Sequence, residues 1–126
     1  MSSTSRRRIK GITYIEGTVS GPTGKRATLE FLVDSGAKYT LLPFKNWKAI
    51  GLKPVRRLTF VLADGTKVKR NISECYINLP QGKTHTPVVL GKPGDEALLG
   101  VVTLEELGLV LNPFQRSLQP ARMMMA

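Results

Sequence analysis

The stretch Phe31-Leu32-Val33-Asp34-Ser35-Gly36-Ala37 decides how the rest of this chain is interpreted. Three apolar residues typical of a buried strand run directly into an acid, a hydroxyl and a glycine. Short polar residues and glycine favour a tight loop after such a strand, because they accept turn conformations that other residues resist. The pattern therefore predicts a buried strand that delivers the carboxylate of Asp34 into a loop. Asp-Ser-Gly is also a common turn sequence, so a second motif is needed before a function can be assigned to Asp34.

A later segment supplies that second motif. Leu98-Leu99-Gly100 follows a polar break at residues 91–95 and precedes a short helical pattern. We expect Thr103 to be the N-cap of this helix, Glu106 to complete a capping box and Gly108 to end it.

An apolar strand ending in Asp34-Ser35-Gly36-Ala37, with a later Leu98-Leu99-Gly100 strand leading into a short helix, resembles the retropepsin family of aspartic proteases. The resemblance covers residues 12–120. It implies an all-β fold: a retropepsin-like closed or partly open β-barrel with one or two short helices, assembled as an obligate homodimer. It also implies an aspartic endopeptidase, a hydrolase that cleaves peptide bonds.

The same resemblance assigns roles to the motif residues. Asp34 would be the catalytic carboxylate, and a second copy must supply the other one because the chain has a single Asp-Ser-Gly. Ser35 would bond the partner's loop, Gly36 would let backbone approach the carboxylate, and Ala37 completes the loop. Leu98, Leu99 and Gly100 would form the strand behind that loop.

A hairpin is predicted in the middle of the chain, where Asp64-Gly65 lies between two alternating runs. By position it matches the family's flap, which closes over bound substrate. Its tip would comprise Leu62, Ala63, Asp64, Gly65 and Thr66. The alternative is an ordinary surface hairpin.

Two positions depart from the retroviral pattern. Retroviral members usually place an acid two residues after the loop glycine and an arginine after the second glycine, but here these positions hold Lys38 and Val101. Both halves of that ion pair are missing together. We therefore expect a different way of locking the dimer.

The remaining pattern completes a single domain. We expect strands at 12–19, 27–33, 40–42, 58–62, 66–70, 72–79 and 86–90, and a helix after Pro43 that is ended by Gly51. Residues 109–113 and 117–120 are expected to finish the fold. Trp47 in that helix is expected in the core. Residues 1–10 would be a disordered basic leader, 11–120 the protease domain and 121–126 a frayed tail.

Composition excludes several classes of protein. The 126 residues are 41% hydrophobic but contain no apolar run long enough to span a membrane, and no secretory signal follows the basic start. We therefore expect a cytoplasmic protein without a membrane partner. The single cysteine, Cys75, is expected to be buried and inert. The single histidine, His85, has no second His or any Cys cluster with which to bind a metal ion. No metal or cofactor is expected.

The net charge of +10 is unevenly distributed. Between Ser35 and Ser73 there are nine basic residues against one acid, Asp64. Such a face can attract nucleic acid or acidic peptides, but no aromatic ladder interleaves the charges, so a solubilising surface is favoured over a nucleic-acid partner. The expected partners are a second copy and a peptide or unfolded protein substrate, with acidic substrates favoured by the strand from Lys67 to Arg70.

Three hypotheses remain open at this point. The first is the dimeric aspartic endopeptidase. The second uses the same fold as a non-proteolytic interaction or dimerisation module. The third is a basic, β-rich nucleic-acid-binding domain.

Overall fold

The structure is a computed structural model that describes residues 13–112 and 114–121. The predicted leader 1–10, the first residue of the strand expected from Ile12, Pro113 and the tail from Arg122 lie outside the described residues. In the described part, nine strands and two six-residue helices make a mostly β fold, as predicted. None of the helices in these residues is long and apolar enough to cross a membrane.

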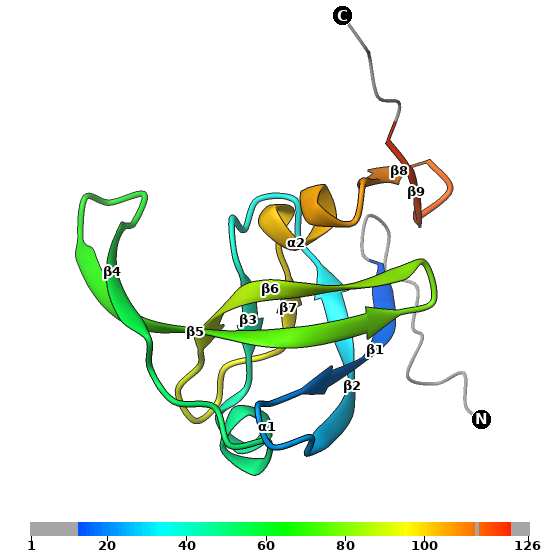
Figure 1. The fold of residues 1–126 in the computed structure, drawn as a ribbon. Coiled ribbons are helices and arrows are strands. Elements are labelled where there is room, and N and C mark those ends of the chain that lie inside the picture. The colour runs from blue at the N-terminus through cyan, green and yellow to red at the C-terminus, as the bar shows by residue number, and fades with distance from the viewer. Residues whose placement is uncertain (1–12, 113, 122–126) are drawn as a thin grey trace, which may run out of the picture.

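Seven strands form one sheet that curls round on itself (Figure 1). Their order is β1-β2-β7-β3-β6-β5-β4, and an additional pairing of β1 with β5 makes the sheet ring-like. In chain order they are β1 (Tyr14–Ser20), β2 (Arg26–Val33), β3 (Thr40–Leu42), β4 (Arg56–Val61), β5 (Lys67–Leu79), β6 (Gly82–Leu90) and β7 (Leu98–Leu99).

The two helices and a separate hairpin complete the fold. Helix α1 (Phe44–Ala49) follows β3 and helix α2 (Val101–Glu106) follows β7, while β8 (Leu109–Asn112) and β9 (Ser117–Pro120) pair with each other. Gly51 and Gly108 follow the two helices at positive φ of 78° and 68°, which glycine adopts without strain. Both glycines were predicted to end the helices.

The core lies inside the ring. Its fully buried side chains come from strands on opposite sides of the ring and from Ile50, directly after α1. The strand residues include Val19, Phe31, Leu42, Ile77, Val88 and Leu99. Trp47 is half-buried at the edge of this core rather than inside it, because its indole N–H reaches out to donate a 2.8 Å hydrogen bond to the carbonyl of Gly91.

Strand β5 differs from the expectation of separate strands at 66–70 and 72–79. It runs unbroken for 13 residues, because Asn71 pairs with Arg57 on β4 while Ile72 already pairs with Val89 on β6. The first half of β5 forms a hairpin with β4 that extends away from the ring at the left of Figure 1. We refer to β4, the first half of β5 and their connecting turn as the β4–β5 hairpin.

Candidate active site

Asp34 lies directly after the end of β2, at a place where three strands meet. Strand β7 is inserted between β2, to which it runs parallel, and β3, to which it runs antiparallel. The N–H of Asp34 donates to the carbonyl of Leu99 on β7 at 3.1 Å, and the preceding Val33 is buried. The backbone at Asp34 is therefore fixed by the sheet even though its side chain is only half-buried.

The loop after Asp34 folds back on the carboxylate. The N–H of Gly36 donates to Oδ1 of Asp34 at 2.9 Å, and the N–H of Ala37 donates to the carbonyl of Asp34 at 3.0 Å. A Cβ at position 36 would lie 3.2 Å from Oδ1, so glycine allows the close approach. Ser35 and Gly36 are exposed at the tip of the loop.

The two sequence motifs meet in space, as the resemblance implied. Leu98 and Leu99 form β7, and the first N–H groups of α2 bond the loop: Val101 donates to the carbonyl of Ala37 and Val102 to that of Lys38, both at 2.9 Å. Gly100 lies between them under Tyr39, where a Cβ would come within 2.3 Å of the Tyr39 carbonyl carbon. Only glycine fits at position 100.

The prediction that Thr103 caps α2 is wrong. Gly100 is the N-cap, no side chain caps the helix, and Glu106 is its last residue. The reason is that β7 ends at Leu99 and the extended Gly100 turns the chain into the helix at once, so that Thr103 falls inside the first turn. Its hydroxyl faces the core instead of the helix end.

Three buried threonines replace the expected cap. The hydroxyl of Thr103 lies 2.6 Å from that of Thr40 and 2.8 Å from that of Thr86. Thr40 also accepts the N–H of Gly100 at 3.0 Å. This threonine network (Thr40, Thr86 and Thr103) joins β3, β6 and α2 beneath the Asp34 loop. Sequence reasoning missed it, although a threonine at the start of two apolar strands was a signal that pointed to buried hydroxyls.

The predicted hairpin at Asp64-Gly65 is present, and all five tip residues from Leu62 to Thr66 are exposed. The N–H of Gly65 donates to Leu62 O at 2.9 Å, with Gly65 at a φ of 87°. Hydrogen bonds from the Thr66 hydroxyl and N–H hold the pKa of Asp64 below its ordinary value.

The β4–β5 hairpin reaches the Asp34 segment at one aromatic contact. Phe60 packs edge-to-face on Tyr39, with ring centroids 6.1 Å apart. Tyr39 lies just beyond the Asp34 loop, and the ammonium of Lys38 is 5.7 Å from its ring centroid. The inner face of the hairpin is therefore turned toward the chain that follows Asp34. No hydrogen bond or ring contact among the described residues joins the tip, residues 62–66, to Asp34.

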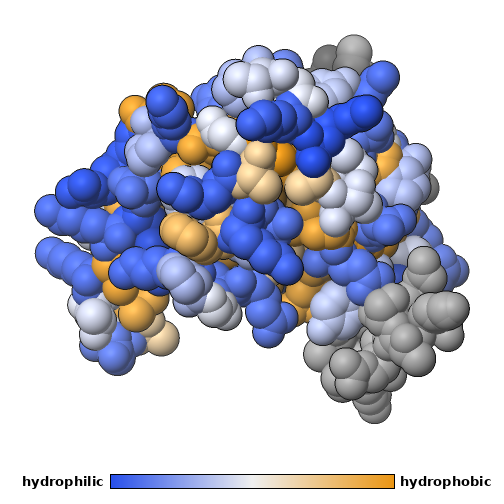
Figure 2. Space-filling view, turned by 90° about the horizontal axis from the view of Figure 1, so that it is seen from below, coloured by the Kyte–Doolittle hydropathy of each residue, from blue (hydrophilic) through white to orange (hydrophobic). Residues whose placement is uncertain are grey.

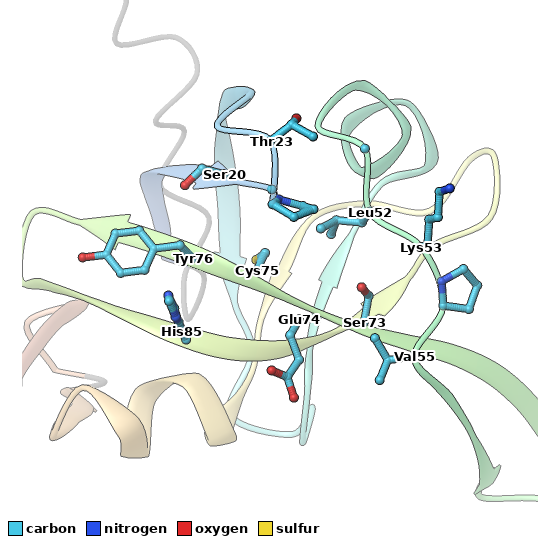
Figure 3. A pocket seen from close by; sticks show the side chains of 14 residues that line it. Ser20, Thr23, Leu52, Lys53, Val55, Ser73, Glu74, Cys75, Tyr76 and His85 are labelled. Carbon is cyan, nitrogen blue, oxygen red and sulfur yellow. The ribbon is translucent and has the colours of Figure 1, made fainter.

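A pocket of about 740 Å³ lies elsewhere on the molecule (Figure 3). It is bounded by residues 20–23, 51–55 and 73–76, and no residue of the Asp34 loop lines it. Burial raises the pKa of the Cys75 thiol to about 12, so Cys75 is not a nucleophile there. His85 packs edge-to-face on Tyr76. We see no catalytic constellation in this pocket.

Comparison with solved structures shows a protein of similar fold. The chain is similar to the solution structure of the simian foamy virus (mac) protease, with a TM-score of 0.55 and 19% sequence identity over 75% of this chain and 94% of that chain. The fold of this chain is therefore similar to that of the viral protease. No protein-family model matches the sequence, and no curated protein matches it. The likeness therefore concerns the fold alone.

Proposed function

We propose that this protein is an aspartic endopeptidase in which Asp34 of two identical subunits activates a water molecule. The strongest support is the position of Asp34 in a retropepsin-like fold. The backbone of Asp34 is bonded to strand β7, and its half-exposed carboxylate accepts a hydrogen bond from its own loop. Residues 11–120 would be the protease domain.

The chemistry requires a second carboxylate close to the first. One group must accept a proton from water while another protonates the carbonyl oxygen or the leaving amine. Two carboxyl groups about 3 Å apart cannot both ionise, so the pair holds one proton and can do both. The protonated carboxyl group of the pair is then the acid, and the ionised one is the base.

Neither of the other two aspartates of the described chain pairs with Asp34. The other two aspartates are engaged in turns of their own: Asp64 accepts the N–H of Thr66, and Asp95 accepts the N–H of Lys92. A homodimer with Asp34 on its two-fold axis supplies the partner, through an interface built from the same residues twice. Ser35 and Gly36, exposed at the loop tip, would then face the partner's loop.

The other motif residues keep the Asp34 loop in place. Ala37, Leu98, Leu99 and Gly100 hold the Asp34 loop against the sheet through the hydrogen bonds described above. The β4–β5 hairpin, with Leu62, Ala63, Asp64, Gly65 and Thr66 at its tip, would close over an extended peptide and exclude bulk water. No cofactor enters this mechanism.

The test is proteolysis by the full chain. We expect wild-type protein to cleave an unfolded protein mixture at acidic pH, with activity falling as the shared proton leaves, and Asp34→Asn to cleave nothing. Asp95→Asn makes the same chemical change at a loop carboxylate and keeps an acceptor for Lys92 N–H, so it should retain activity. Cleavage by Asp34→Asn, or a flat pH profile, would contradict the proposal.

A further inference from the structure

A second, smaller pocket of about 370 Å³ lies between the β4–β5 hairpin and helix α1. It shares no residue with the Asp34 loop, and the proposed hydrolysis does not use it. Four cations and no acid are among the residues that line it, together with two aromatic rings of α1: Arg57, Lys69, Arg70, Lys92, Phe44 and Trp47. The molecule seen from below, the side on which α1 lies, is covered mainly by hydrophilic residues with small hydrophobic patches between them (Figure 2).

The four cations of this pocket form no ion pair with a carboxylate of the described residues. Within residues 13–112 and 114–121 the ion pair recorded is Arg56 with Glu74, at 4.0 Å, and it lies outside the pocket. The Nη1 atom of Arg70 is shut off from solvent and has no hydrogen-bond acceptor among the described residues. Like charges gathered without a counter-charge favour an anionic ligand.

The nearby acid forms no ion pair with these four cations among the described residues. Asp95, in the loop that contributes Lys92 to the pocket, uses its carboxylate to accept the backbone N–H of Lys92 at 2.8 Å. Arg57 lies opposite Asn71 across the hairpin, and Lys69 is the next residue along the same face. Three of the four cations therefore lie on two paired strands, and Lys92 comes from a loop.

The aromatic rings of α1 are poorly placed to stack on nucleic-acid bases. Phe44 and Trp47 pack edge-to-face on each other, with centroids 5.4 Å apart, and the ammonium of Lys48 is 5.7 and 5.8 Å from their centroids. The indole N–H is already bonded to Gly91. Single-stranded nucleic acid is usually held by free aromatic faces, so these contacts argue against it.

The neighbouring strand edge suits a polypeptide instead. In the described part of the chain, β4 is the last strand of its sheet and pairs with β5 alone. Its outer edge therefore offers backbone N–H and C=O groups that an extended peptide can bond and a phosphate backbone cannot match. Arg57 lies on this same strand.

We propose that the basic pocket formed by Arg57, Lys69, Arg70 and Lys92 binds an acidic segment of the polypeptide substrate, outside the cleavage site. That the bound peptide is a substrate rests on the proposed function, but binding of the peptide to the pocket does not require Asp34. Carboxylates of the segment would meet the four cations, while its backbone would lie along the edge of β4.

The experiment measures binding of a fluorescein-labelled oligoglutamate peptide to the full chain by fluorescence anisotropy at fixed ionic strength. The Asp34→Asn background is used so that no peptide is cleaved. Because opposite charges attract across the pocket, Arg57→Glu with Lys69→Glu should weaken binding by about tenfold. The matched control, Lys25→Glu with Lys83→Glu, changes the net charge equally at exposed sites outside the pocket and should have a much smaller effect.

Two results would overturn the proposal. One is an equal loss of affinity in the pocket variant and in the control, which would mean that only net charge matters. The other is tighter binding of a labelled single-stranded oligonucleotide than of oligoglutamate, with the same sensitivity to the pocket variant. Arg57→Gln with Lys69→Gln, checked by circular dichroism, guards against misfolding. If the pocket binds oligoglutamate while wild-type protein cleaves nothing, the docking site stands and the proposed function fails.

Discussion

The N–H of Gly36 donates a 2.9 Å hydrogen bond to Oδ1 of Asp34, so the loop that presents the carboxylate also holds it in place. This hydrogen bond fixes the direction in which the second carboxylate oxygen of Asp34 points. In the proposed dimer that second oxygen would face the partner's carboxylate.

Gly36→Ala tests this hydrogen bond. The added Cβ would meet Oδ1 at 3.2 Å, so the carboxylate or the loop must shift by a few tenths of an ångström. Because small misplacements of catalytic groups are costly, we expect kcat/KM to fall about tenfold or more. The free energy of unfolding should change by less than about 1 kcal/mol, since the site is exposed. Equal losses of activity and stability would contradict a positioning role for the loop.

Thr103→Val tests the threonine network. The substitution keeps the shape of the side chain but leaves the buried hydroxyls of Thr40 and Thr86 without their shared partner. We expect the free energy of unfolding, measured by urea denaturation, to fall by about 1–3 kcal/mol. Thr28→Val is the matched control, because it breaks an exposed threonine pair, Thr18 with Thr28, on the surface of the sheet. A similar loss in both variants would refute a special role for the buried network.

Gly65→Val tests whether the β4–β5 hairpin acts as a flap. Gly65 has a φ of 87° and Gly24, in the turn between β1 and β2, has a φ of 86°, with open space around each Cβ position. Valine at either site should therefore cost similar stability, about 1–3 kcal/mol. Only Gly65→Val should also lower kcat/KM in a peptide-cleavage assay. If the two variants cleave equally well, the flap lies elsewhere.

Cys75 should make the protein less stable at high pH. Burial raises its pKa to about 12, whereas the exposed thiol of the unfolded chain titrates near 9. The folded state thus favours the neutral thiol: this contribution is complete below pH 9 and is lost as the pH rises toward 12. Cys75→Ala removes it. The difference in unfolding free energy between wild type and Cys75→Ala should therefore shrink across this range, and a constant difference would show that the thiol is not desolvated.

Local signals in the sequence predicted much of this fold. The strand ending at Asp34, the hairpin turn at Asp64-Gly65 and the glycine that ends each helix depend on neighbouring residues, and the structure confirms them. The meeting of the Asp34 loop with Leu98-Leu99-Gly100 came from the resemblance, because contacts between distant segments have no local signal.

Long-range packing explains what the sequence did not reveal. The start of α2 is set by the close passage of Gly100 under Tyr39, and the threonine network joins Thr40 to Thr103 across 63 residues of chain. A capping pattern at Thr103 was locally reasonable, but the buried hydroxyls of two other strands competed for the same side chain. The basic pocket also needed the fold, since it brings α1 and the loop at Lys92 against the β4–β5 hairpin.

The central claim, that each subunit contributes one carboxylate to a shared site, is tested most directly by mixing subunits. A fixed amount of wild-type protein is incubated with an equal amount of Asp34→Asn until subunits exchange, at a concentration that keeps both dimeric. Mixed dimers carry a single Asp34 and should be inactive. Random exchange therefore predicts a fall in peptide-cleavage activity to about one half of that of wild type alone. Unchanged activity, with exchange demonstrated by native mass spectrometry, would contradict the shared site.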